Sequence, residues 1–297
     1  MDRVQVTVFT PAYNRSYIIG ELYSSLRRQS CKEFEWVVID DASDDDTQQK
    51  VENWANDEKE FPIRYIRKEI GGGKHRAIND AVKLANGKLF FIVDSDDVLT
   101  DDAIEKILHW ESEIENKAGF AGVSGNRGKN KDEIIGDTFS GEHIDAPFTQ
   151  KEAYNILGDK AEVYYTEVLE KYPFPEFEGE RFITERVVWD KIGADGLKIR
   201  WHNEVIYLCE YLPDGLTRNG DEIFRKNPKG AAYNLNQMIK IYQYSFFQRL
   251  QSVNGYIDFY LPVLSPEVIR EYLGISRFYY MLCRSAARVY RFIKYGR

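Results

Sequence analysis

The stretch 88-KLFFIVDSDDVLT-100 decides the fold, because an apolar run ends there abruptly in acidic residues. Leu89 to Val93 has the length and the composition of a buried strand, and the acids of 94–97 follow at once. Alternate side chains of an extended chain face the same side, so Asp94 and Asp96 are expected to point together. Such close carboxylates repel one another unless water or a cation separates them. The pattern suits Mg²⁺ or Mn²⁺ bound together with a diphosphate.

A solvated turn is the alternative interpretation of the same acids. In that case Asp97 or Asp101 caps the helix that is expected to begin near 101–103. Capping by one aspartate does not explain why several acids gather at the end of an apolar strand, so the metal or diphosphate interpretation is favoured.

Upstream of this strand, strands and helices alternate. We expect strands at 4–9, 34–39 and 63–66, and helices at 18–26, 47–55 and 74–85, with Gly87 just past the last helix. This spacing is typical of βαβ units and a mostly parallel sheet. The predicted fold class is α/β, with a Rossmann-like mixed, mostly parallel sheet flanked by helices and a C-terminal helical extension.

Three polar clusters follow strands of this predicted sheet, at 10–14, 40–46 and 94–97. Ligands bind beyond the carboxyl ends of such strands, so the clusters should converge on one edge. Asp40 or Asp41 is a candidate for accepting hydrogen bonds from a base or a ribose, although an acidic turn capped by Ser43 or Asp46 gives the same pattern. The glycines of 71–73, followed by Lys74, form either a phosphate cradle or a flexible connection.

Further acids and a histidine downstream complete the set of candidates. Glu178, Glu180 and Glu185 lie close together, and Glu185 is at the start of a predicted helix at 184–192 that contains Trp189. One of them is a candidate base for an acceptor hydroxyl, although acids near a helix start are also common for dipole reasons. His202 follows a predicted strand and is a weaker candidate for completing a metal site, since lone histidines are usually structural.

Composition bounds the function classes. The chain has 297 residues, is 43% hydrophobic and carries a formal net charge of -8, which argues for a folded protein and against a general nucleic-acid binder. Its three cysteines form no CxxC pair, which favours a reducing compartment. We find no signal-peptide pattern and no run of about 18 apolar residues. We therefore expect a cytoplasmic protein, peripheral on the inner face of a membrane if its last helix binds lipid.

That last segment, 276-SRFYYMLCRSAARVYRFIKYGR-297, is basic and rich in aromatic residues. Such a helix either lies on an anionic membrane surface or packs on its own domain or on a second subunit, which leaves a homo-oligomer open. The domains are expected at 1–220 for the α/β part and at 221–297 for the helical region.

The ordered motifs resemble family 2 glycosyltransferases of the GT-A fold, of the bacterial polysaccharide-assembly type. The resemblance lies in TVFTPAYNRSYIIGELYSSLRRQSCKEFEWVVIDDASDDDT and in GGGKHRAINDAVKLANGKLFFIVDSDDVLTDDAI, which together cover about the first 105 residues. It implies a nucleotide-sugar donor, a divalent metal at a DxD motif, and inversion at the anomeric carbon. The implied donor-binding residues are Thr10, Ala12, Tyr13, Asn14, Asp41, Lys74, Asn79, Asp94, Ser95 and Asp97.

The resemblance also assigns catalytic roles. Asp94 and Asp96 are the implied metal ligands, and Asp96 and Glu185 the implied catalytic residues. The family's base usually lies in a Glu-Asp pair shortly before a Trp, whereas this chain has Thr184-Glu185, so Glu180 is the reserve candidate. The stretch 211-YLPDGLTRNGDEIFRKNPKG-230 resembles a loop that helps close the site in a subgroup.

Together these features predict an inverting, metal-dependent glycosyltransferase that uses Mn²⁺ or Mg²⁺. It is expected to transfer sugar from a nucleotide-sugar, with UDP favoured, to a glycan or lipid-linked acceptor in surface polysaccharide synthesis. Because the QxxRW motif of processive synthases is absent, it is expected to add one sugar and not to polymerise. The alternatives are a catalytically inactive sugar-nucleotide-binding or assembly subunit and a sugar nucleotidyltransferase. The latter needs a Gly-rich, basic loop after the first strand, where this chain has TPAYNRS.

Overall fold

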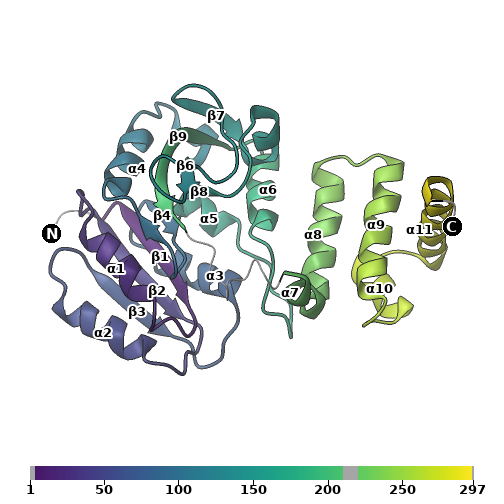
Figure 1. The fold of residues 1–297 in the computed structure, drawn as a ribbon, viewed down its shortest axis with the longest axis horizontal. Coiled ribbons are helices and arrows are strands. Elements are labelled where there is room, and N and C mark those ends of the chain that lie inside the picture. The colour runs from purple at the N-terminus through teal and green to yellow at the C-terminus, as the bar shows by residue number, and fades with distance from the viewer. Residues whose placement is uncertain (1–3, 210–219, 296–297) are drawn as a thin grey trace. The chain divides into compact units, whose positions relative to one another are not determined.

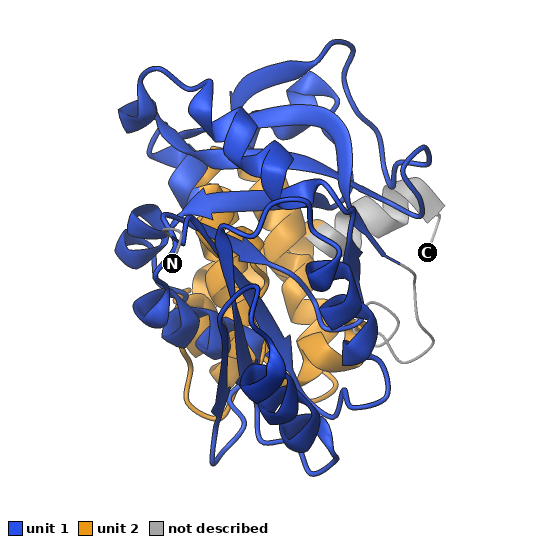
Figure 2. Ribbon diagram, turned by 90° about the vertical axis from the view of Figure 1, so that its left-hand side faces the viewer, with its two compact units in different colours: residues 1–174, 191–212 blue, residues 175–190, 213–297 orange. Residues whose placement is uncertain are grey.

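The computed structural model describes residues 4–209 and 220–295, with side chains described up to residue 286. The chain forms two compact units (Figure 2). We call residues 1–174 and 191–212 the sheet unit, and residues 175–190 and 213–297 the helical unit. The predicted loop at 211–230 falls in part on residues 210–219, which lie outside the described residues. The predicted domain boundary near residue 220 stays a prediction.

The first half of the sheet is parallel, as the alternation of strands and helices predicts. Strands β1 and β2 pair in parallel, β3 extends the sheet beyond β2, and β4 pairs with the other side of β1 (Figure 1). Their bounds are β1 Val6–Ala12, β2 Phe34–Asp40, β3 Ile63–Arg67 and β4 Leu89–Ile92. Each strand except β3 is almost wholly buried, which explains why these strands read as continuous apolar runs.

The second half of the sheet is mixed. The strand order is β3-β2-β1-β4-β8-β6-β9-β5, with β7 also paired to β9. Strand β8 runs antiparallel to β4 and β6, whereas β6 and β9 are parallel. The bounds are β5 Val98–Leu99, β6 Phe120–Gly128, β7 His143–Pro147, β8 Lys160–Tyr165 and β9 Lys198–Leu208. The predicted α/β class with a mixed sheet is therefore confirmed, although β6 and β7 were not expected.

Helices cover this sheet. An aromatic stack of Tyr23, Trp36 and Trp54 joins α1 and α2 to β2, with ring centroids 4.5–6.2 Å apart. The helices are α1 Ile19–Arg27, α2 Thr47–Asp57, α3 Lys74–Leu84, α4 Ala103–Ser112 and α5 Thr166–Lys171, with 3-10 turns η1 Lys117–Gly119 and η2 Phe148–Tyr154.

Gly87 corrects one local expectation. Helix α3 ends at Leu84 with an extended Ala85, so Gly87 does not terminate it. A Cβ at Gly87 would lie 2.3 Å from the backbone nitrogen of Thr7, and the Gly87 N–H donates to the Thr7 hydroxyl at 2.9 Å. The glycine is there because the chain passes close to β1 as it enters β4.

The helical unit begins with the first half of α6 Arg186–Ala194, since the division between the units falls within that helix. Ser245 starts α9 with a capping box and Ser265 caps α10, where Pro266 occupies the first turn. The remaining helices are α7 Gly220–Lys226, α8 Pro228–Ile241, α9 Phe246–Tyr260, α10 Pro266–Leu273 and α11 Arg277–Tyr295.

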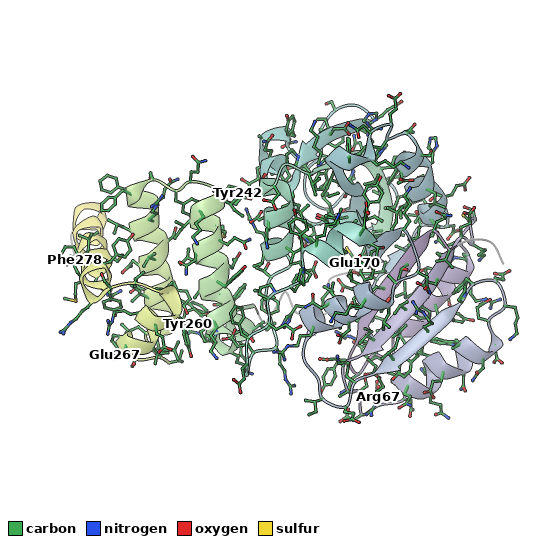
Figure 3. The ribbon with its side chains drawn as sticks, turned by 180° about the vertical axis from the view of Figure 1, so that it is seen from behind. Arg67, Glu170, Tyr242, Tyr260, Glu267 and Phe278 are labelled. Atoms are coloured by element: carbon green, nitrogen blue, oxygen red, sulfur yellow. The ribbon has the colours of Figure 1, made fainter. Side chains whose placement is uncertain are left out.

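Over residues 277–286, where its side chains are described, helix α11 packs against α9 through one face. Tyr280 and Cys283 are buried in the core of this unit, which also contains Tyr260 (Figure 3). On the other face Phe278 is 79% exposed. The side chains predicted to make the end of this helix basic, from Arg288 onward, lie outside the described residues. No described helix is both long enough and apolar enough to span a membrane.

Candidate active site

The first two polar clusters are tied to each other at the carboxyl ends of β1 and β2. Asn14 adopts a left-handed conformation with φ 52°, in which its N–H donates to the Ser43 hydroxyl at 2.9 Å. Its side-chain oxygen accepts from the Asp44 N–H at 2.9 Å, and the Ser16 N–H donates to Asp45 at 2.9 Å. The predicted convergence of these two strand ends is therefore present in the structure.

The glycine-rich loop connects the second cluster to the third. The N–H groups of Gly72 and Gly73 donate to the two carboxylate oxygens of Asp41 at 2.7 and 2.8 Å. Gly73, with φ 89°, leads into α3, and the ammonium group of Lys74 lies 2.6 Å from Asp94 Oδ1. The loop N–H groups thus bind an anion, which in this structure is a carboxylate of the protein itself.

Asp40 and Asp41 have different surroundings although they are adjacent. Asp40 is fully buried and accepts hydrogen bonds from the Ser43 N–H at 2.7 Å and from the Tyr65 hydroxyl. Its carboxylate shapes the end of β2, and burial raises the pKa of Tyr65 well above its ordinary value, with the bond to Asp40 adding to the shift. Asp41 is partly exposed, so it is the acid of this pair that a ligand can reach.

A tyrosine is hydrogen-bonded to both ends of the acidic turn, residues 94–97, which follows β4. The Asp97 N–H donates to the Asp94 carbonyl at 3.2 Å, which closes the turn. The Tyr207 hydroxyl donates to Asp97 Oδ2 at 2.6 Å and accepts from the Asp94 N–H at 3.0 Å. Asp97 is only 7% exposed, whereas Asp94 and Asp96 are partly exposed. Asp97 therefore supports the turn, and neither it nor Asp101 caps α4, whose first turn has no side-chain cap.

Electrostatics separate the two ends of the turn. Burial raises the pKa of Asp97 to about 7, and the nearby charges of Asp94 and Asp96 add to the shift. At Asp94 burial acts in the same direction, but the positive charges of Lys74 and Arg127 outweigh it and the pKa lies below its ordinary value. The turn therefore has more negative charge than its neighbours compensate, which is a property of cation-binding and catalytic sites.

The donor set fits a hard divalent cation. Asp96 makes no hydrogen bond or ion pair with another described residue, so its oxygens are available as ligands. Among residues 4–209 and 220–295 no group of three or more His, Cys, Asp and Glu side chains is arranged to hold a metal ion. Two aspartates with phosphate oxygens and water completing the shell are the usual arrangement for Mg²⁺ bound with a nucleotide.

The remaining donor-binding candidates are more dispersed. Thr10 is fully buried and its hydroxyl accepts from the Trp36 indole N–H at 2.9 Å, and Ala12 is buried as well. Tyr13 is 57% exposed at the end of β1. Asn79 uses both amide atoms on the backbone of Phe174, at 2.8 and 2.9 Å. Ser95 is buried within the acidic turn.

Arg127 and Tyr207 were not predicted, although both reach this site. The Arg127 guanidinium lies 4.3 Å from the centre of the Tyr207 ring, and its Nε donates to the Lys160 carbonyl at 3.0 Å. The two residues face each other across β6 and β9. The signal that would have found Tyr207 is the pairing of β9 with β5, directly after the acidic turn.

The two candidate bases belong to the helical unit and differ in their surroundings. Glu180 is 5% exposed, and its carboxylate accepts the N–H groups of Lys229 at 2.6 Å and Gly230 at 2.8 Å. It therefore binds the start of α8, as acids at helix N-termini do. Glu185 is partly exposed, and its carbonyl accepts the first N–H groups of α6, from Val188 at 2.9 Å and from Trp189.

His202 lies in an aromatic cluster. Its ring stacks on Trp110 with a centroid distance of 4.2 Å, and His143 on the paired strand is 5.3 Å away. Its Nε2 is buried without a hydrogen-bond partner in the part of the chain that the structure describes. Burial lowers the pKa of His202 to about 3, with the charge of His143 contributing. These contacts favour the structural interpretation of His202 over a role as a metal ligand.

Comparison with known proteins identifies the family of the chain. The family model described as "Glycosyl transferase family 2" matches residues 7–165. The chain is 25% identical over 189 residues to the GalNAc(5)-diNAcBac-PP-undecaprenol beta-1,3-glucosyltransferase of Campylobacter jejuni, a match over 62% of this chain and 58% of that protein. The match thus spans less than two thirds of the relative's length.

Two solved structures share the fold. Residues 1-349 of Staphylococcus aureus TarS in complex with UDP-GlcNAc superpose with a TM-score of 0.63 at 20% identity, covering 99% of this chain and 93% of that chain. The mannosyltransferase PcManGT from Pyrobaculum calidifontis in complex with GDP-Man and Mn²⁺ superposes with a TM-score of 0.57 at 17% identity, over 96% and 84% of the two chains. With its family model matched over more than half of its length, the chain belongs to glycosyl transferase family 2.

Proposed function

We propose that this protein is an inverting, metal-dependent glycosyltransferase that moves one sugar from a nucleotide-sugar donor to a hydroxyl group. The observation that carries the proposal is the connection of three strand ends, those of β1 and β2 through Asn14 and those of β2 and β4 through the glycine-rich loop. Through Asp41, Gly72, Gly73 and Lys74 the loop connects the end of β2 to the acidic turn after β4. This edge of an open α/β sheet is where nucleotides bind.

The donor is a nucleoside diphosphate sugar, with UDP favoured. Asp41 accepts an N–H of the base, and Lys74 turns from Asp94 to the diphosphate when the donor enters. The TarS structure with UDP-GlcNAc supports this choice of nucleotide. Tyr13, which is exposed at the end of β1, is positioned to contact the base.

Asp94 and Asp96 hold a divalent cation, Mn²⁺ or Mg²⁺. When bound, the cation neutralises the charge that develops on the leaving diphosphate. The partly exposed oxygens of Asp96 and the Mn²⁺ in the PcManGT complex support this assignment.

Glu185 is the proposed base. It takes the proton of the acceptor hydroxyl as that oxygen bonds to the anomeric carbon, while the bond from this carbon to the diphosphate breaks on the opposite face. The nucleoside diphosphate leaves with the bonding electrons. Glu180 is less suitable, because its carboxylate already binds the N–H groups at the start of α8.

The acceptor is a glycan or a lipid-linked glycan in bacterial polysaccharide synthesis. The Campylobacter jejuni relative, whose name includes an undecaprenol-linked substrate, supports this class. A lipid-linked acceptor places the reaction at the inner face of a membrane, and the exposed Phe278 and Met281 of α11 are suited to contact it. Co-sedimentation with anionic vesicles tests the contact. It is refuted if the wild type and Phe278→Ser/Met281→Ser bind equally.

A transfer assay tests the catalytic proposal. Purified protein is incubated with UDP-sugars, Mn²⁺ and glycan or polyprenyl-linked acceptors, and Asp96→Asn and Glu185→Gln are compared with the wild type. Each variant is expected to lose at least about 100-fold in rate without losing its fold. Wild-type rates in both variants would refute the roles assigned here. Metal-dependent UDP binding without transfer to any acceptor would favour the inactive binding subunit.

A further inference from the structure

Tyr207 is a fully buried residue whose ring contacts Arg127 and Phe91. It lies on β9, with the Arg127 guanidinium 4.3 Å from the ring centre and the Phe91 ring in a T-shaped arrangement at a centroid distance of 6.1 Å. Arg127 comes from β6 and Phe91 from β4, so strands on both sides of β8 hold this ring. A ring held in this way places its hydroxyl with little freedom.

That hydroxyl joins the first and last residues of the acidic turn. It donates to Asp97 Oδ2 at 2.6 Å and accepts from the Asp94 N–H at 3.0 Å. The turn is connected to the same strand a second time, because β5 pairs with β9 with Leu99 opposite Tyr207. Both ends of the turn therefore take their position from one side chain.

We propose that Tyr207 is a positioning residue for the metal and the donor diphosphate, acting through the backbone of the acidic turn. The inference rests on the proposed function, since it assigns Asp94 and Asp96 to the cation. Tyr207 does not touch the ligand in this proposal. It fixes the distance between the two carboxylates that do, which is the role that outer hydrogen bonds have around metal sites.

Removing the hydroxyl should leave two groups without a partner. The Asp94 N–H and the Asp97 carboxylate both lose the bond, and the turn must rearrange or accept water to satisfy them. The ring, Arg127 and Phe91 keep their packing in Tyr207→Phe, so the core contacts remain. The defect should therefore appear in metal-dependent binding more than in folding.

The matched control is Tyr165→Phe. Tyr165 is also a buried tyrosine of the sheet unit, and its hydroxyl donates to Glu111 Oε1 at 3.0 Å. Glu111 lies on α4 and is bound by Lys88 and Lys117, so this carboxylate is compensated by two cations. The control therefore removes a comparable buried hydrogen bond that does not involve the acidic turn.

The test measures Mn²⁺ and UDP binding by calorimetry and by the electron paramagnetic resonance signal of free Mn²⁺, so it does not depend on knowing the acceptor. Tyr207→Phe should weaken Mn²⁺ binding in the presence of UDP by about 10-fold or more. UDP binding without metal should change less than about twofold, and Tyr165→Phe should behave as the wild type. Thermal unfolding is measured on each variant.

Equal Mn²⁺ affinity in Tyr207→Phe and the wild type would overturn the inference. If Tyr207→Phe does not fold, Asp97→Leu breaks one of the two hydrogen bonds of the Tyr207 hydroxyl from the other side and must also weaken Mn²⁺ binding, and wild-type affinity there overturns the inference too. Failure of the wild type itself to bind Mn²⁺ with any nucleotide is a different result, because it refutes the proposed function.

Discussion

Tyr242 in the helical unit and Tyr207 in the sheet unit make the same kind of contact. Each hydroxyl donates to a buried aspartate, Tyr242 to Asp190 at 2.7 Å and Tyr207 to Asp97 at 2.6 Å, and each ring has an arginine over it (Figure 3 labels Tyr242). We call Tyr242, Asp190 and Arg186 the helical set, and Tyr207, Asp97 and Arg127 the sheet set. The two sets differ in the group to which the arginine donates its hydrogen bonds.

The helical set is closed, which means that its positive and negative charges pair with each other. Arg186 donates through Nε to Asp190 at 2.9 Å and through Nη2 to the Tyr242 hydroxyl at 3.0 Å, so one cation matches one anion. Burial raises the pKa of Tyr242 to about 12, with the bond to Asp190 adding to the shift, so the hydroxyl stays protonated. This set connects α6 to the end of α8, and it needs no further ligand.

The sheet set is open, which means that its arginine and its aspartate do not pair with each other. Arg127 donates to a backbone carbonyl instead of to Asp97, and two more aspartates lie in the same turn. The same three residue types thus act as a structural connection where charges balance, and under the proposed function they border a cation site where charges do not balance. A perturbed buried carboxylate indicates function only when its charge lacks compensation.

The largest expected effect is on the closed set. Asp190 is fully buried, so Asp190→Asn leaves the Arg186 guanidinium without its anion and weakens the bond from Tyr242. We expect the free energy of unfolding to fall by about 3 kcal/mol. Urea unfolding followed by circular dichroism measures this loss. A change below about 1 kcal/mol would mean that the set is not a stabilising connection.

His202 gives the next largest effect and tests burial without catalysis. With its pKa lowered to about 3, His202 stays neutral in the folded protein while the unfolded chain takes up a proton near the ordinary value of 6.5. The contribution of neutral His202 to the free energy of unfolding is complete above pH 6.5. It is lost as the pH falls below that value, by about 1–2 kcal/mol between pH 7 and 5. The charged neighbours are His143, Arg200, Asp145 and His109.

Unfolding measured at several pH values checks this. His202→Phe keeps a ring on Trp110 and should flatten the profile between pH 7 and 5. His109→Gln is the comparison, because His109 is exposed, pairs with Glu113 at the end of α4, and is the smallest of the influences named for the pKa of His202, so it should change the profile much less than His202→Phe does. An unchanged profile in His202→Phe would show that other groups set the acid limit.

The sequence predicts the parallel half of the sheet well for a physical reason. Strands such as β1, β2 and β4 are buried on both faces, and their apolar runs end where the chain reaches solvent and turns polar. Strand β6 is not predicted in this way, because its sequence FAGVSGNRG contains glycines and polar residues and is not a continuous apolar run. A Cβ at Gly122 would meet the Val163 carbonyl at 1.9 Å, so close packing against β8 explains that glycine.

The candidate site is predictable in part for the same reason. Asp41, Lys74 and Asp94 follow local patterns, and the loop contacts bring them together. Tyr207 and Arg127 have no local pattern, since their importance comes from strand pairings that join residues 110 or 80 positions apart, such as Tyr207 with Asp97 and Arg127 with Tyr207. Glu180 is the opposite case, because its contacts with the start of α8 cannot be read from the sequence and favour a structural role.

Replacing the aspartate by asparagine should change the free energy of unfolding in opposite directions in the open set and in the closed set. Asp97→Asn removes a negative charge close to Asp94 and Asp96 and still offers an oxygen to the Tyr207 hydroxyl. We expect the free energy of unfolding to rise by on the order of 1 kcal/mol at neutral pH. Measured beside Asp190→Asn in the same urea series, a fall of similar size in both variants would remove the distinction between the two sets.

Lys74 should have the smallest effect on stability. The side chains of Lys74 and Asp94 are 25% and 27% exposed, and an ion pair of that exposure stabilises a fold by less than about 1 kcal/mol. Lys68 and Asp80, at 31% and 35% exposure, form a comparable pair that does not involve the acidic turn. Lys68→Met and Lys74→Met should therefore change the unfolding free energy alike, while only Lys74→Met weakens UDP binding, by about tenfold. Calorimetry with UDP and Mn²⁺ decides this, and equal affinities in the two variants would mean that Lys74 serves the fold, as the closed set does, and not the donor.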